Sequence, residues 1–273
     1  MDKVIKKNVK SKDGTNLYYE VYATTKSHPV LFFVHGVGGD LDAWQYVKNN
    51  LFEKGFSSIA MDLRGHGKSD HPSSSKQYEL DNFIEDVITV LDIEKIDKVI
   101  LIGHSLGAVL VTHVALRHQE RIEKLIIISS SYIPPSYFKI PGIFLLINTL
   151  AMVSLPPLSG RHSIYPLGKH HKDIEAFGLI RTIIRNSLRS YILSSKEILK
   201  LNMGASLKGI GVPTLIISGA KDSIFPTKIS EYIHSQIPQS QLKIIPGANH
   251  VVILNNIKET TDYICDFLIK NSR

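Results

Sequence analysis

The sequence predicts an α/β protein built on a mainly parallel, doubly wound sheet. Short, continuous apolar runs recur along the chain, and such runs are typical of strands that are buried on both faces. Segments with apolar residues at helical spacing separate most of these runs, and strands that alternate with helices pair in parallel. The chain has 273 residues, 43% of them hydrophobic and 21% charged, so it can bury a large core.

The chain opens with a predicted hairpin. Residues 4–9 and 16–22 are its two strands, and Asp13-Gly14 is its turn. Apolar residues recur at every second position of the second strand, which indicates that one of its faces is buried. Apolar strands then follow at 30–34, 57–61, 99–102 and 125–128, separated by helices around 44–51, 83–91 and 108–116.

Regular alternation stops between residues 132 and 206. This segment is rich in proline and ends in an amphipathic helical stretch over 174–201. Strands return at 214–218 and 241–245, and a helix over 257–269 closes the pattern. We interpret the interruption as a helical cap inserted after the sixth strand. The domains are then a first core part, 1–131, a cap or lid, 132–206, and a second core part, 207–273.

Within the cap, residues 140–158 carry no charge and are bounded by Lys139 and Arg161. A membrane-spanning helix needs roughly 20 apolar residues, and prolines and polar residues break this stretch before that length is reached. We therefore expect an apolar lid over a substrate pocket and no transmembrane segment. Weak interfacial attachment of the cap to lipid is the alternative.

The charge of the chain limits its expected partners, and its cysteine content limits its expected disulfides. The formal net charge is +7, and part of the excess comes from lysines in the predicted first strand. Lysines on an edge strand discourage edge-to-edge pairing, and no basic helix with interleaved aromatic residues indicates a nucleic-acid partner. Cys265 is the only cysteine, so we expect no intramolecular disulfide. We expect its side chain to be buried and to behave as a small hydrophobic group. No apolar secretory signal is visible, so we expect a cytoplasmic protein, with monomer and homodimer both open.

The most informative stretch is Gly103-His104-Ser105-Leu106-Gly107, which links the apolar run 99–102 to an apolar helix. Gly-x-Ser-x-Gly in this setting is typical of a tight turn, or elbow, that carries a nucleophilic serine. Its two glycines lack Cβ atoms, so strand and helix can approach closely around a strained residue at Ser105. The turn places the Ser105 hydroxyl above the sheet at the positive end of the helix, where an oxyanion is stabilised.

A nucleophilic serine needs a base, and the base needs an acid that orients it. Asp222 and His250 follow the last two predicted strands, so both lie on the sheet edge that carries Ser105. The chain order serine, aspartate, histidine is also the one expected for this fold. We assign Ser105 as nucleophile, Asp222 as acid and His250 as base. His104, inside the elbow, is interpreted as a packing or hydrogen-bonding neighbour.

A glycine-rich loop supplies the remaining part of the predicted site. The loop is His35-Gly36-Val37-Gly38-Gly39, and its glycines allow it to fold back toward the serine. A tetrahedral intermediate needs two or more donors for its oxyanion, and we assign the backbone N–H groups of Leu106 and Val37. The residues assigned to substrate binding are His35, Gly36 and His104.

Three patterns that would indicate a cofactor or a metal fail on inspection. Gly65-His66-Gly67-Lys68-Ser69 ends like a phosphate-binding loop, but Asp62 occupies the position of its first glycine. Gly36-Val37-Gly38 starts like a dinucleotide fingerprint, but Leu41 stands where glycine or alanine is needed. His170-His171 lacks the spacing of a zinc site. We therefore expect no cofactor and no metal.

Taken together, these motifs resemble those of the α/β-hydrolase superfamily, and the likeness spans nearly the whole chain. It implies an eight-stranded core, a helical cap after the sixth strand and no cofactor. It also implies a structural role for the run 62–69, whose arginine and aspartate brace the loops beneath the active site. The cap matches no subfamily, so the substrate stays open. The motifs are His35-Gly36, Asp62 to Ser69, Gly103 to Gly107, Gly219 to Asp222, and Gly247 to His250.

The expected activity is hydrolysis of carboxylic esters through an acyl-enzyme on Ser105. His250 would act as general base and then as general acid, while Asp222 holds its tautomer. Haloalkane dehalogenases of this family carry aspartate at the elbow, so serine argues against that activity. The uncharged cap favours small-molecule esters with apolar short- to medium-chain acyl groups, or monoacylglycerol-like substrates. Alternatives are a lactone, thioester or carbon–carbon bond hydrolase on the same triad, or a non-catalytic ligand-binding member of the fold.

Overall fold

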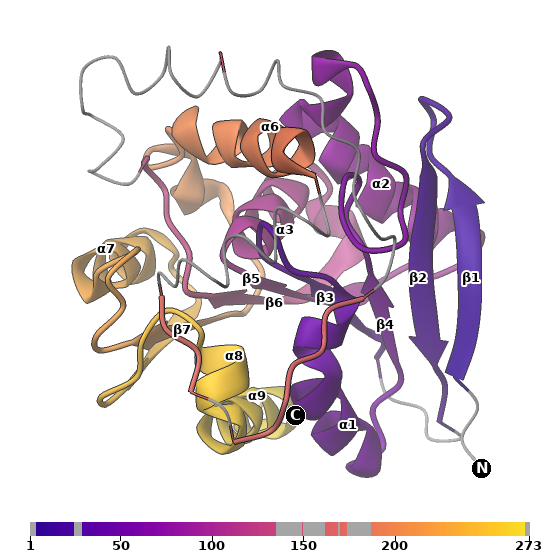
Figure 1. Ribbon diagram of the computed structural model, residues 1–273. Helices are drawn as coiled ribbons and strands as arrows, with labels where there is room; N and C mark the ends of the chain where they lie inside the picture. The colour runs from indigo at the N-terminus through magenta and orange to yellow at the C-terminus, as the bar shows by residue number, and fades with distance from the viewer. Residues whose placement is uncertain are drawn as a thin grey trace.

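The apolar runs form one sheet in the computed structural model, which describes residues 4–24, 29–134, 149, 162–168, 170–173 and 187–270. Within these residues eight strands pair in the order β1-β2-β4-β3-β5-β6-β7-β8 (Figure 1). The strands are β1 (Val4–Lys10), β2 (Asn16–Tyr22), β3 (Leu31–Val34), β4 (Ser58–Met61), β5 (Val99–His104), β6 (Ile122–Ile128), β7 (Thr214–Gly219) and β8 (Ser240–Ile245).

The strand directions confirm the predicted sheet. β1 and β2 form an antiparallel hairpin around Gly14, whose φ is +85°, and β2 also runs antiparallel to β4. All other neighbouring strands are parallel, so the carboxyl ends of β3 to β8 share one edge of the sheet. β1 is an edge strand whose residues are exposed or half-buried, as its lysines indicated.

Helices cover both faces of the sheet, as a doubly wound fold requires. Leu101 and Leu125 belong to one core, with α2, α3 and α7, whereas Ile100 and Ile126 belong to the other, with α1 and α9. Neighbouring residues of one strand thus face opposite cores, which explains the continuous apolar runs. The helices are α1 (Gln45–Glu53), α2 (Leu80–Ile93), α3 (Leu106–Arg117), α6 (Leu188–Leu199), α7 (Thr227–Gln236), α8 (Val252–Asn255) and α9 (Ile257–Lys270).

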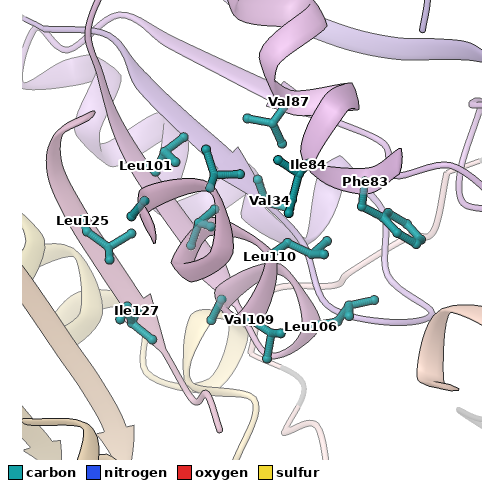
Figure 2. Packing of buried hydrophobic residues seen from close by; sticks show 14 of the residues in the cluster. Val34, Phe83, Ile84, Val87, Leu101, Leu106, Val109, Leu110, Leu125 and Ile127 are labelled. Atoms are coloured by element: carbon teal, nitrogen blue, oxygen red, sulfur yellow. The ribbon is translucent and has the colours of Figure 1, made fainter. Parts of the chain in front are cut away.

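Figure 2 shows how α2 and α3 meet above the sheet. Ile84 and Val87 of α2 point toward Leu110 of α3 and toward the strands, and all of these side chains are buried. Fully burying a side chain of this size contributes about 1.5–3 kcal/mol. The helix that begins directly after Ser105 is therefore held firmly against the sheet.

Two elements differ from the sequence-based expectation. α7 was not predicted, because few of its side chains are large and apolar. β6 begins at Ile122, three residues before the predicted apolar run. The prediction began too late because the charged Lys124 interrupts the apolar pattern. The Lys124 ammonium is buried and donates to the main-chain oxygen of Leu268 (2.9 Å). Cys265 is buried in α9, as predicted.

The chain between β6 and β7 contains the predicted cap. α6 is the described part of the expected helical stretch, and it lies against α3 and the short helix Ser75–Tyr78. Much of the predicted cap, including the uncharged stretch apart from Thr149, lies outside the described residues. The boundaries at 132 and 206 therefore stay a prediction. No helix in the described part of the chain is long and apolar enough to cross a membrane.

The run Asp62 to Ser69 braces several loops, as the family resemblance implied. The buried Arg64 guanidinium donates to both oxygens of Asp86 on α2 (2.6 and 2.7 Å) and to Asp13 in the hairpin turn (2.7 Å). Asp62 accepts from the main-chain N–H groups of Leu41 and Lys68 (both 2.8 Å). These bonds tie the opening hairpin and α2 to the loops that follow β3 and β4.

Asp86→Asn should destabilise the fold by about 3 kcal/mol, because it leaves the buried Arg64 charge without its main partner. Urea unfolding followed by circular dichroism measures this loss. Asp81→Asn on the same helix is the matched control, since Asp81 pairs with Arg117 at the surface (2.6 Å) and should change stability by less than about 1 kcal/mol. Equal losses in the two variants would contradict the bracing role of Arg64.

Candidate active site

Ser105 occupies a strained turn between β5 and α3. Its φ is +55° and its ψ is −118°, a backbone conformation that side-chain-bearing residues rarely adopt. Its main-chain N–H donates to the Ile128 carbonyl at the end of β6 (3.0 Å), and its carbonyl accepts from Val109 within α3 (3.1 Å). The turn therefore has the geometry that the Gly-x-Ser-x-Gly pattern predicts.

Two glycines make this turn sterically feasible. A Cβ atom at Gly107 would lie 2.6 Å from the His35 carbonyl oxygen, and one at Gly103 would lie 2.6 Å from Cα of Ala108. Both contacts are with backbone atoms, which cannot move aside as a flexible side chain can. Strand β5, helix α3 and the end of β3 therefore meet backbone to backbone, and this contact supports Ser105.

Asp222 and His250 come together at the carboxyl ends of β7 and β8. The distance between His250 Nδ1 and Asp222 Oδ2 is 2.9 Å, and both side chains are buried. The other oxygen of Asp222 accepts from the main-chain N–H groups of Ile224 (2.9 Å) and Phe225 (2.7 Å). With Nδ1–H donating to the carboxylate, Nε2 of His250 is the nitrogen left to accept a proton.

The elbow and the loop that carries His250 are in direct contact. His104 Nε2 donates to the His250 carbonyl oxygen (3.0 Å), and the centroids of the two rings are 5.1 Å apart. Among the described residues, no hydrogen bond joins the Ser105 hydroxyl to His250. In enzymes without bound substrate such catalytic contacts are often long and tighten in the complex.

The glycine-rich loop after β3 lies against the serine, as predicted. A Cβ atom at Gly36 would be 3.0 Å from the Ser105 Cβ. Leu106 is the first residue of α3, and the N–H groups in the first turn of a helix have no partner within that helix. In the described part of the chain, the N–H groups of Leu106 and Val37 donate to no protein acceptor. These two groups are the donors that the sequence predicts for an oxyanion.

The two histidines assigned to substrate binding have protein partners. His35 accepts from the Leu63 N–H at Nε2 (3.0 Å), while its Nδ1 donates to the Gly36 oxygen (2.8 Å). Burial lowers the pKa of His35 to about 4, so its ring is neutral and has no polar atom left for a substrate. Its predicted binding role is thereby limited to shaping the loop. Burial and the charge of His250 lower the pKa of His104 to about 3, and this ring donates to His250 as described.

A segment from the β6–β7 connection crosses this sheet edge, and sequence reasoning did not identify it. We call residues 162–168 and 170–173 the strap; in Figure 1 it passes α1, then α8, and ends beside the loop after β7. At its first end, His162 Nε2 lies 2.7 Å from Asp62 and Nδ1 lies 3.1 Å from Asp42. The Ser163 N–H donates to Asp40 (2.5 Å). The Tyr165 carbonyl accepts from two side chains of α1, Gln45 (2.9 Å) and Tyr46 (2.6 Å).

The second end of the strap binds the loops that carry the candidate acid and base. The His171 carbonyl accepts from Asn249 (2.6 Å) and from Asn255 (2.7 Å). Asp173 accepts from the main-chain N–H groups of Ser223 (2.9 Å) and His250 (2.7 Å). No periodic pattern surrounds these strap residues in the sequence, so the only signal was an irregular segment containing charged and histidine side chains.

The electrostatics of the first anchor depend on His162. Burial alone would lower the pKa of this residue, but hydrogen bonds to Asp42 and Asp62 and the negative charges of Asp62 and Asp40 raise it to about 10. The imidazolium in turn lowers the pKa of Asp42 against the opposing effect of burial. His162 is therefore charged at neutral pH and links the strap to the braced run that begins at Asp62.

The sequence matches the family model described as the alpha/beta hydrolase fold over residues 29–143 and 169–257. These two ranges make up more than half of the chain. The eight-stranded, mainly parallel sheet, the flanking helices and the strained serine turn agree with that match. The protein therefore belongs to the α/β-hydrolase family.

Three known proteins illustrate the similarity. A Haemophilus influenzae protein named "Putative esterase/lipase" is 29% identical over 274 residues, which cover 96% of this chain and 91% of the relative. The crystal structure from work on carboxylesterases of Nitrososphaera gargenis has a TM-score of 0.76 at 20% identity, covering 96% of this chain and 97% of the other. The enol-lactonase from Burkholderia xenovorans LB400 has a TM-score of 0.72 at 20% identity, covering 96% and 99%. At these identities the two structures show the fold alone.

His162→Gln should destabilise the protein most at low pH. The folded-state pKa of about 10 lies above the ordinary value of 6.5, so the protonated anchor contributes its full stability below pH 6.5. That contribution should fall as the pH rises toward 10. We expect a loss of about 2 kcal/mol at pH 6 that shrinks toward pH 10, measured by urea unfolding at each pH.

His118→Gln is the control for this experiment. His118 lies 3.7 Å from Glu120, and both side chains are exposed, so its replacement should change stability little at any pH. A loss for His162→Gln that is the same at pH 6 and pH 10 would show that the ion pairs of the anchor do not carry its stability.

Proposed function

We propose that this protein is a serine hydrolase that cleaves carboxylic esters through an acyl-enzyme on Ser105. The observation that carries the proposal is the buried bond between His250 Nδ1 and Asp222 Oδ2 (2.9 Å), on the same sheet edge as the strained serine. A buried aspartate that fixes one nitrogen of a histidine leaves the other nitrogen free to act as a base.

In the proposed mechanism, Ser105 Oγ attacks the ester carbonyl while His250 Nε2 takes the hydroxyl proton. The tetrahedral intermediate places its negative oxygen against the N–H groups of Val37 and Leu106. It collapses when the carbon–oxygen bond to the alcohol breaks, and His250 returns the proton to that alcohol. Water then attacks the acyl-enzyme with His250 again as base, which releases the acid and regenerates the serine.

Two features of the fold favour the charge that develops in these steps. The Leu106 N–H lies at the amino-terminal, positive end of α3, which stabilises an oxyanion. In well-studied enzymes each such donor accounts for about 3–4 kcal/mol of transition-state stabilisation. The Asp222 carboxylate stabilises the imidazolium that forms when His250 takes the proton, because both side chains are buried.

The proposed substrates are small esters with an apolar short- to medium-chain acyl group, or monoacylglycerol-like esters. The uncharged residues 140–158 of the predicted cap support an apolar substrate. The name of the Haemophilus influenzae relative supports an ester. A second candidate substrate is a lactone, because the same triad can attack its ester carbonyl. A lactone undergoes the same acyl transfer, but its alcohol stays attached to the acyl group.

We expect the wild-type protein to hydrolyse p-nitrophenyl esters, with a chain-length optimum between acetate and palmitate that reports the size of the pocket. Ser105→Ala should lower kcat/KM by at least about 10³-fold, because it removes the nucleophile. Stopped-flow or plate absorbance of p-nitrophenolate measures both. Ser235→Ala, at an exposed serine of α7, is the control and should keep wild-type activity.

A fluorophosphonate probe separates the alternatives in the same set of proteins. If the wild type is labelled at Ser105 but cleaves no ester, panels of lactones, thioesters and vinylogous diketones show which type of bond it cleaves. If the wild type is neither labelled nor active, the serine hydrolase proposal is wrong. A ligand-dependent rise in thermal stability would then favour a binding protein.

Asp222→Asn should lower kcat by about 10³–10⁴-fold while the thermal midpoint stays within a few degrees. The asparagine amide would donate to Nδ1, so the ring would carry its proton on Nε2 and could no longer accept the serine proton. Ester kinetics and differential scanning fluorimetry measure the two quantities. Lys221→Gln, at the exposed neighbouring position, is the control. A variant that keeps activity within tenfold of wild type would remove Asp222 from the proposed triad.

A further inference from the structure

We infer that Asp173 is a positioning residue that holds the main chain of His250 and joins the loops of the acid and the base. The inference rests on the proposed function, because it names a residue through which the β6–β7 connection acts on the same site. Asp173 is the last described residue of the strap, and nothing in its local sequence marks it as part of the site.

A single carboxylate makes three hydrogen bonds to two different loops. Oδ1 of Asp173 accepts from the main-chain N–H of His250 (2.7 Å). Oδ2 accepts from the main-chain N–H of Ser223 (2.9 Å) and from its hydroxyl (2.7 Å). Ser223 directly follows Asp222, so Asp173 contacts the candidate base and the neighbour of the candidate acid at once.

His250 is held at three atoms, and each holder comes from a different part of the chain. Asp222 binds its Nδ1, His104 binds its carbonyl oxygen (3.0 Å), and Asp173 binds its N–H. The first two holders belong to the β7 loop and to the elbow. Asp173 is the holder that comes from the β6–β7 connection. The position of this connection therefore affects the position of His250.

Besides the bond between Asp222 and His250, the two loops have main-chain links that lie before the base. The Ala220 N–H donates to the Ile245 carbonyl (3.0 Å) and the Lys221 N–H to the Ala248 carbonyl (2.7 Å). β8, which precedes His250, pairs with β7 alone among the described strands. Beyond Ala248 the loop must still place the imidazole correctly over the serine. A misplacement of about 1 Å in such a group can lower a rate by about 10²-fold.

An aspartate suits this position because its two oxygens accept bonds on two sides. Asparagine has the same shape but a single acceptor oxygen, so Asp173→Asn leaves one of the two main-chain N–H groups of the bridge without its acceptor. Where the NH₂ group faces Ser223, only the Ser223 hydroxyl can still bond to it. Its NH₂ group would face either the His250 N–H or the Ser223 N–H, and two donors cannot bond one another. The substitution therefore opens the bridge with very little change in volume.

The test compares Asp173→Asn with two other variants. Lys172→Gln changes an exposed neighbour and is the matched control, and Ser223→Ala removes one of the three bonds. We expect Asp173→Asn to lower kcat toward p-nitrophenyl butyrate about 10- to 100-fold, with KM within about threefold of wild type. Ser223→Ala should lose less than about fivefold, and Lys172→Gln should match the wild type. Asp173→Glu keeps both acceptor oxygens and should recover part of the rate.

A second readout does not depend on turnover. In ¹⁵N-labelled protein, amide exchange at His250 should be at least about tenfold faster in Asp173→Asn than in wild type, while amides of central strand β5 exchange as before. This pattern separates loss of local positioning from loss of the whole fold. General destabilisation would speed exchange in β5 as well, and the smaller folded fraction would lower the apparent kcat without changing KM. Faster exchange in β5 would therefore count against the inference.

The outcomes separate this inference from the proposed function. If the wild type hydrolyses esters and Asp173→Asn keeps its kcat, the positioning role is wrong and the hydrolase stands. If the wild type neither turns over nor reacts with a fluorophosphonate, the proposed function is wrong. His250 amide exchange then decides the remaining question, since faster exchange in Asp173→Asn supports the structural hold on His250 and unchanged exchange overturns it.

Discussion

The backbone contact at Gly103 and Gly107 is the constraint on which the rest of the structure depends. Helix α3 can begin directly at the end of β5 only because no side chain separates them from each other or from β3. This approach sets the unusual backbone angles of Ser105 and brings the loop after β3 against it. The apolar face of α3, packed on α2 and the sheet, compensates for the strain, so a distorted residue sits on a rigid support.

The histidines at the carboxyl edge of the sheet fall into two kinds, according to the groups that they bond to. His35 and His104 bond only to main-chain groups in the described structure, and burial keeps both rings neutral. His162 and His250 instead face carboxylates, which at His162 raise the pKa of the ring to about 10. The neutral rings form fixed walls around the serine. The charged His162 ring anchors the strap, and the His250 ring is, we propose, the catalytic base.

Sequence reasoning located the sheet, both cores and the turn at Ser105 because these depend on local patterns. A buried strand is an apolar run, and a tight strand-to-helix turn needs glycines at fixed positions. Asp222 and His250 could be placed because parallel strands bring their carboxyl ends to one edge. His162 and Asp173 could not, since their partners are 100 and 77 residues distant and no repeat links them. Likewise, nothing local shows that both ring nitrogens of His35 are already in use.

The contact between His104 and His250 joins residues 146 positions apart. A ribosome makes the elbow long before it makes β8, so a chain that ends just before β8 contains Ser105 and Asp222 but lacks the candidate base His250. The hydroxyl of such a chain is an ordinary alcohol. The contact between the elbow and the His250 loop therefore forms only after β8 has been made, as a property of the finished sheet.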